Sequence, residues 1–183
     1  MSLVELIAQA DERGLAASGL ACLDRCVPLL GGDDEVLRPL WGSLSDAGEA
    51  GDWGELLEQV RGKLSADDTG DDEVVLLARR MLEAAPVGRG GSEMRMWADA
   101  CSVAALQIHR LLDPLGDAVP VDGPREGRTE GMSPLVAAEL RRQIAVLELL
   151  ASHGVGGLRP ALEVSTEGRR VLRAVVRRRA RRR

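Results

Sequence analysis

Three cysteines and two histidines are the residues of this sequence whose types and spacing could support metal or nucleophilic chemistry. Cys22 and Cys26 are four residues apart, so a helix would place both thiols on the same side. Together with Cys101 and His109 they provide the ligand types of a tetrahedral zinc site. Cys26 and Cys101, however, fall on or beside apolar helical stripes, where a buried cysteine behaves as a small hydrophobic residue. We therefore predict buried structural thiols, with no metal and no other cofactor.

The two histidines are the candidates for acid–base catalysis, but no nucleophile motif accompanies them. His109 and Asp113 are four residues apart near an expected helix end, a spacing that suits a base and the carboxylate that orients it. A histidine in the last turn of a helix is explained more simply by its interaction with the helix dipole, and His153 has a similar position. We therefore expect a non-enzymatic protein, with an enzyme whose site is not visible in the sequence as an alternative.

Other short patterns match known ligand sites only in part. The acidic stretch 67–73 lacks the glycine at the sixth position, and the glutamate at the twelfth, that a calcium loop of the EF-hand type requires. Asp33 and Asp34 precede an apolar helical run, where N-capping accounts for carboxylates without a metal. Residues 88–91 are rich in glycine but follow an expected helix, whereas a phosphate-binding loop follows a strand. We predict no binding site at any of these three places.

Charge is distributed very unevenly along the chain. Residues 1–168 carry all 29 acidic side chains and 15 basic ones, whereas residues 169–183 carry nine arginines and no acid. Such a block of like charge is typical of an interaction tail, and arginines can neutralise the phosphates of nucleic acid. An anionic lipid, an acidic protein and the chain's own acidic surface are the other partners that this charge fits. The predicted tail residues are Arg169, Arg170, Arg173, Arg177, Arg178, Arg179, Arg181, Arg182 and Arg183.

Composition narrows the functional classes further. Aromatic residues make up only 2% of the 183 residues, and the absence of Phe and Tyr disfavours aromatic sugar platforms and stacking grooves for single strands. Lys63 is the one lysine among 24 basic residues, which we interpret as the codon bias of a GC-rich bacterium. Arginine content alone is therefore weak evidence of function. An odd number of cysteines, and an N-terminus without a signal-peptide pattern, predict a cytoplasmic protein with reduced thiols.

Helical periodicity dominates the sequence and predicts an all-α fold of about seven helices. Ser2 and Glu5 form a capping-box pattern, after which apolar residues recur three and four positions apart. The final segment is ambiguous, because residues 162–165 alternate like a short strand and the helix pattern resumes after them, up to about Val176. The expected helices cover about 3–13, 15–30, 33–48, 52–64, 73–85, 92–112, 133–153 and 166–176.

The first four expected helices form two hairpins with a similar sequence pattern, as if one hairpin were repeated. At an offset of 37 residues Leu3 matches Leu40 and Leu20 matches Leu57. Hairpins repeated at about this period can stack into a continuous core. Residues 41–64, with the sequence Ala-Gly-Asp-Trp at the turn, resemble a tetratricopeptide-type helical hairpin. This resemblance, over about residues 3–64, implies a helical-hairpin array, and the same pattern also fits two amphipathic hairpins of an ordinary helical bundle.

These observations give one domain organisation and three functional hypotheses. We expect a helical-hairpin domain at 1–113, a flexible linker rich in Gly and Pro at 114–132, helices at 133–176 that pack on the same core, and a disordered or extended basic tail at 177–183. The leading hypothesis is a scaffold or adaptor that binds another protein or a peptide through a hairpin groove. The alternatives are a nucleic-acid-associated regulator that acts through the arginine tail, and an enzyme.

Overall fold

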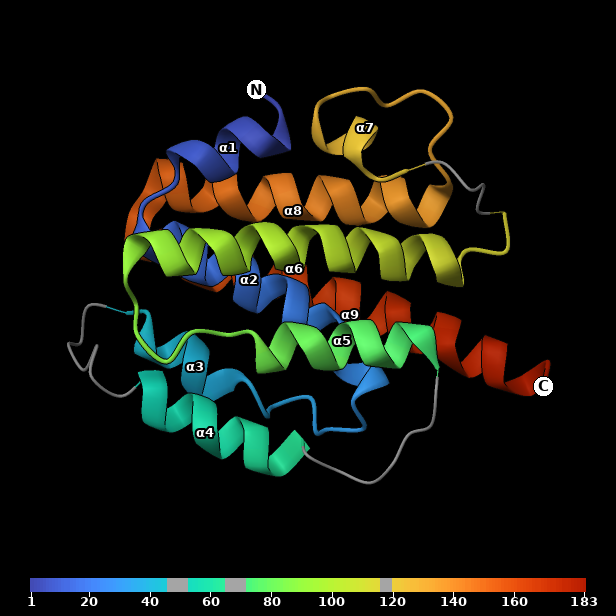
Figure 1. Ribbon diagram of the computed structural model, residues 1–183, viewed down its shortest axis with the longest axis horizontal. Helices are drawn as coiled ribbons and strands as arrows, with labels where there is room; N and C mark the ends of the chain where they lie inside the picture. Colours follow the sequence, from blue (N-terminus) through green and yellow to red (C-terminus); the bar gives the residue numbers. More distant parts are fainter. Residues whose placement is uncertain (46–52, 65–71, 116–119) are drawn as a thin grey trace.

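The computed structural model describes residues 1–45, 53–64, 72–115 and 120–183, and every regular element in these ranges is a helix. The all-α prediction is therefore confirmed for this part of the chain (Figure 1). None of its helices is both long and apolar enough to cross a membrane. The α-helices are α1 (Leu3–Gln9), α2 (Glu12–Arg25), α3 (Arg38–Ser43), α4 (Trp53–Leu64), α5 (Glu73–Glu83), α6 (Gly91–Leu112), α7 (Asp122–Arg125), α8 (Pro134–His153) and α9 (Leu158–Arg181).

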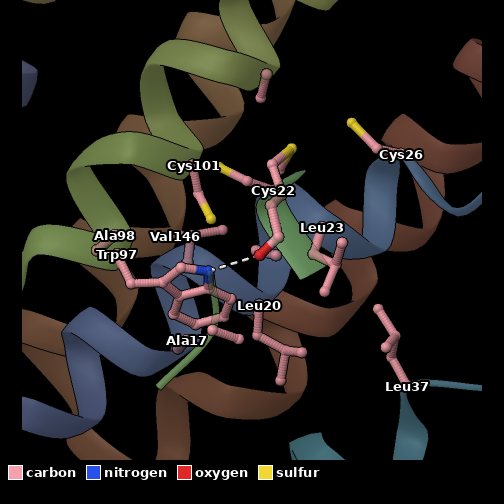
Figure 2. Packing of buried hydrophobic residues seen from close by; sticks show 14 of the residues in the cluster. Ala17, Leu20, Cys22, Leu23, Cys26, Leu37, Trp97, Ala98, Cys101 and Val146 are labelled. Atoms are coloured by element: carbon pink, nitrogen blue, oxygen red, sulfur yellow. Dashed lines mark hydrogen bonds between the residues drawn. The ribbon is translucent and has the colours of Figure 1, made fainter. Parts of the chain in front are cut away.

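Helix α2 lies at the centre of the bundle, where it packs against α6, α8 and α9. All of its residues from Gly14 to Arg25 are buried. A Cβ atom at Gly19 would lie 2.6 Å from the ring of Trp97, so only glycine lets this indole pack against α2. The Trp97 Nε1–H donates to the Met81 carbonyl at 2.9 Å, which satisfies the indole's polar group inside the core (Figure 2).

The first two expected hairpins occupy different surroundings. Helix α1 packs against α8 and α6, whereas α3 packs against α4 and α2. The capping box at the start of α1 is present as predicted, with the Ser2 hydroxyl accepting from the Glu5 amide and the Glu5 carboxylate accepting from the Ser2 amide. The turn of the second hairpin, at 46–52, lies outside the described residues. The tetratricopeptide-type arrangement therefore stays a prediction.

The C-terminal segment differs from its prediction in two respects. Residues 162–165, which alternate like a strand, belong to helix α9, where the Ser165 and Thr166 hydroxyls donate to carbonyls four residues earlier. The basic residues expected to form a disordered or extended tail from 177 continue the same helix to Arg181. Arginine has a high helix propensity, and acidic side chains of the body pair with α9, so the helix continues beyond Val176.

The segment expected to be a flexible linker contains a short helix and a buried arginine where the structure describes it. Residues 122–125 form the short helix α7, and Arg125 is 7% exposed. Its guanidinium reaches α6, where Nε donates to the Ser102 hydroxyl at 3.2 Å and Nη2 pairs with Asp99. A buried arginine with these two partners anchors the segment to the bundle. Residues 116–119 lie outside the described residues.

Candidate functional site

Helix α9 carries the predicted tail arginines, and two of them are bound to acids of the body. Arg169 pairs with Asp24, which is 1% exposed and also accepts from the Trp41 indole at 3.0 Å. Burial raises the pKa of Asp24, against the opposing effect of Arg169. One turn further along, Arg173 donates to both carboxylate oxygens of Asp34, and these hydrogen bonds lower the pKa of Asp34. These ion pairs clamp the first half of the basic block to the body.

Two more arginines, at the C-terminal end of α9, share a single acid. Asp72 is the N-cap of α5, and its Oδ1 accepts from the Val74 amide at 3.3 Å. Its Oδ2 lies 3.3 Å from Arg179 Nη1 and 3.8 Å from Arg183 Nη2. Four of the nine tail arginines therefore pair with the chain's own acidic groups, as the fold-back alternative expects of them.

The other five tail arginines are exposed and form no ion pair with an acid of the described residues. Figure 1 shows the last turns of α9, which carry most of this set, extending past the ends of α5 and α6. Within the tail, the charge of this set is not matched by an acid of the described residues. Its members are Arg170, Arg177, Arg178, Arg181 and Arg182.

A groove lies where the C-terminal end of α9 meets the end of α6 and the start of α8, and we call it the α9 groove. It encloses about 480 Å³. Its walls are largely apolar, and two of the wall side chains project into solvent, Leu115 at 73% exposure and Leu111 at 40%. Arginines of α9 form its rim. The lining residues are Leu111, Leu112, Asp113, Pro114, Leu115, Pro134, Leu135, Val175, Arg178, Arg179, Arg182 and Arg183.

Asp113 holds two walls of the α9 groove together. It is 8% exposed, and its Oδ1 accepts from the Leu115 amide at 2.9 Å. Its Oδ2 accepts from the Leu135 amide, in the first turn of α8, at 3.0 Å. The N-cap residue of α8, Ser133, makes no capping bond with its own hydroxyl, so Asp113 satisfies this helix start from a distance. The pairing of Asp113 with His109 that the sequence offered as one possibility is not among these contacts.

His109 lies in the core beside a buried carboxylate, and not beside an open site. Its ring is 1% exposed, and Nδ1 lies 2.6 Å from the Ala105 carbonyl, so Nδ1 carries a proton and donates. Nε2 lies 3.5 Å from Glu139, a fully buried residue that accepts two hydrogen bonds from Arg25 and one from Gln143. Burial lowers the pKa of His109. All of these side chains are sealed from solvent, so the cluster is structural, and the periodicity of the sequence gave no sign of it.

The predicted burial of Cys26 and Cys101 is confirmed, and Cys22 is buried as well. All three thiols are fully buried, Cys22 in α2, Cys26 at the C-cap of α2 and Cys101 in α6, and Arg25 Nη2 donates to Cys22 Sγ at 3.5 Å (Figure 2). Burial raises the pKa of Cys22 to about 12 and also raises the pKa of the other two thiols, which suppresses the nucleophilic thiolate. Within the described ranges, no group of three or more His, Cys, Asp or Glu side chains is placed to hold a metal ion.

A second pocket, of about 250 Å³, lies beside α9 near Arg169 and contains the converging charges that the enzyme alternative requires. Most of its charged groups form ion pairs, among them Asp24 with Arg169 and Glu35 with Arg38, whereas Arg170 forms none with the described residues. The Thr166 hydroxyl, which also lines this pocket, donates to the carbonyl of Leu162 at 2.9 Å. The ion pairs of Arg169 with Asp24 and Asp34 fasten α9 to α2 and to the segment before α3.

The structure thus separates the predicted site residues by position. Arg169 and Arg173 form ion pairs with Asp24 and Asp34 of the body. The groove, in contrast, is lined by Arg178, Arg179, Arg182 and Arg183. The α9 groove lies at the C-terminal end of α9, and the hairpin groove expected from the sequence stays a prediction. Comparison of the chain with models of protein families, with curated proteins and with solved structures gave no match.

Proposed function

We propose that this protein is a non-enzymatic helical adaptor, and that it binds an acidic, amphipathic segment of another protein in the α9 groove. The observation that carries the proposal is the pairing of apolar walls with a rim of four arginines. Amphipathic helices bind in such grooves by inserting their apolar face, and charged groups at the edge then fix their orientation. The net negative charge of the remaining surface would repel an acidic segment elsewhere, which directs it to this rim.

The spacing of the free rim arginines supports a helical occupant. Arg178 lies in the last turn of α9 and Arg182 is its C-cap, four residues further on, so the two are about 6 Å apart along the helix axis. Carboxylates at positions i and i+4 of a partner helix have the same spacing. The exposed side chains of Leu115 and Leu111 would be covered by the apolar face between those carboxylates.

Nucleic acid fits the α9 groove less well than an acidic protein segment. Proteins that bind single strands stack bases on aromatic side chains. The three aromatic residues, Trp41, Trp53 and Trp97, are each at most 5% exposed and lie in the core. Apolar walls also add nothing to a contact with phosphates. The nucleic-acid alternative therefore rests on charge alone, and the test below includes it.

Fluorescence anisotropy with a labelled amphipathic peptide tests the proposal. The probe is a synthetic helix of about 16 residues with leucines on one face and glutamates beside them, and a scrambled peptide of equal composition is its control. Reversal of two rim charges, in Arg178→Glu/Arg182→Glu, is expected to weaken binding by at least about tenfold. The matched control is Arg170→Glu/Arg177→Glu, which makes the same charge change on α9 away from the groove.

A second pair of variants tests the apolar walls. Leu115→Ser should weaken binding of the peptide, whereas Met96→Ser, at an equally exposed site outside the groove, should not. Removal of residues 177–183 should abolish binding, and this truncation is preferable to removal of the whole basic block because Leu172 is fully buried. Equal effects of the rim and control variants would contradict the proposal. Tighter binding of a short DNA duplex than of the peptide would favour the nucleic-acid alternative.

A further inference from the structure

Two arginines of the α9 groove have a second role, because the same side chains line the groove and pair with Asp72. Asp72 therefore presents, from within the chain, the functional group that an acidic partner would present from outside. The Asp72 side chain is 23% exposed, Arg179 37% and Arg183 63%. Their separations of 3.3 and 3.8 Å are at the long end for ion pairs. Ion pairs of this kind are weak and exchange readily with other charges.

The ion pairs along α9 are graded from buried to exposed. At one end Arg169 and Asp24 are 7% and 2% exposed at their side chains, and breaking a buried pair leaves an uncompensated charge in the core. At the other end the pairs with Asp72 are in contact with solvent. The buried pair can therefore hold the helix in place while the exposed pairs open.

We infer that Asp72 is an internal competitor of the partner: it occupies two rim arginines of the empty α9 groove, and an acidic residue of the incoming segment displaces it. This inference rests on the proposed function and adds a form of autoinhibition to it. Displacement does not require the cap of α5 to break, because the Val74 amide donates to Asp72 Oδ1, whereas Arg179 Nη1 lies closer to Oδ2, at 3.3 Å, than to Oδ1, at 3.5 Å. The affinity of the groove is then lower than its four arginines alone would give.

Asp72→Asn tests this inference without removing the helix cap. Asparagine caps a helix as well as aspartate does, but it has no charge to compete for the arginines. The matched control is Glu73→Gln, which removes one negative charge at the adjacent, exposed position. Asp72→Asn is expected to raise the affinity for the same labelled peptide by about two- to fivefold, the range of an exposed ion pair, and Glu73→Gln is expected to raise it by less.

A double-mutant cycle provides the second measurement. Arg179→Gln should weaken peptide binding more in the Asp72→Asn background than in the wild type, because the arginine is then wholly available to the peptide. Equal affinities of Asp72→Asn and Glu73→Gln, a loss of affinity in Asp72→Asn, or additivity in the cycle would overturn the inference. If the reversal of Arg178 and Arg182 still weakens binding in that case, the proposed function stands without the internal competitor. If the wild type does not bind the peptide, the proposed function itself fails.

Discussion

Replacement of Glu139 by glutamine should be among the most destabilising single changes in this protein. The carboxylate is fully buried and accepts hydrogen bonds from Arg25 Nε at 2.8 Å, from Arg25 Nη2 at 2.7 Å and from Gln143 at 2.9 Å. Burial alone would raise the pKa of Glu139, but Arg25 and then His109 hold it below its ordinary value. The carboxylate is therefore ionised, and it is the counterion of a guanidinium that is also fully buried.

The expected cost follows from the charge that this change leaves behind. Glu139→Gln retains the shape of the side chain and removes its charge, so Arg25 remains charged in the core. Loss of one partner of a buried ion pair typically costs about 3–5 kcal/mol, a large part of the total stability of a domain. Replacement of both partners by apolar residues, in Arg25→Met/Glu139→Leu, removes the unpaired charge, and such replacements are often neutral or stabilising. The double variant should therefore be more stable than Glu139→Gln.

Urea denaturation followed by circular dichroism measures both free energies of unfolding. The wild type, Glu139→Gln and the double variant are compared at one pH, and a lower midpoint at an unchanged denaturant slope reports lost stability. A cost below about 1 kcal/mol for Glu139→Gln would refute the view that the buried pair is a single electrostatic unit. A double variant less stable than Glu139→Gln would refute the explanation by unpaired charge and would point to the shape of the cluster instead.

Three further predictions concern stability and access to the chain. Gly19→Ala should cost about 1–3 kcal/mol by calorimetry, because its methyl group would overlap the indole ring it faces, whereas Gly42→Ala, with open space around it, should be neutral or stabilising. Burial lowers the pKa of His109 in the folded protein below its unfolded value of about 6.5, so the free energy of unfolding falls as the pH is lowered through this range. His109→Gln removes the titrating group, so urea melts of this variant should show a smaller fall in stability on acidification. Limited trypsin digestion, read by mass spectrometry, should cut after the exposed Arg128 before it cuts after the buried Arg125, and the reverse order would contradict the packing of α7.

Local signals in the sequence predicted most of the helices. The expected helix at 92–112 is observed as Gly91–Leu112, and the expected helix at 133–153 as Pro134–His153. Capping residues, apolar periodicity and Gly or Pro at the ends act within a few positions of each other, so they can be read without knowledge of the fold. The same signals were ambiguous at 162–165, where apolar Leu162 and Val164 alternate with polar Glu163 and Ser165 within a helix that tertiary packing stabilises.

The candidate site was less predictable, because its residues are brought together by distant parts of the chain. Asp113 and Leu135 form a wall of the α9 groove across 22 positions, and Asp24 pairs with Arg169 across 145. No short-range pattern encodes such pairs. The sequence did identify the basic block, since a block of like charge is a local property.

The partners of each arginine, rather than the number of arginines, distinguish structural positions from functional ones in this protein. A chain that uses arginine almost wherever a basic residue is needed will place it in ion pairs, in the core and on the surface alike. Arg25 and Arg169 are buried, and each forms an ion pair with a buried acid that neutralises its charge. Arg178 and Arg182 stand beside exposed leucines of the α9 groove with no acid of the described residues paired to them. At this place the fold leaves positive charge without a counterion and apolar surface without cover. A partner segment with acidic and apolar residues would supply both.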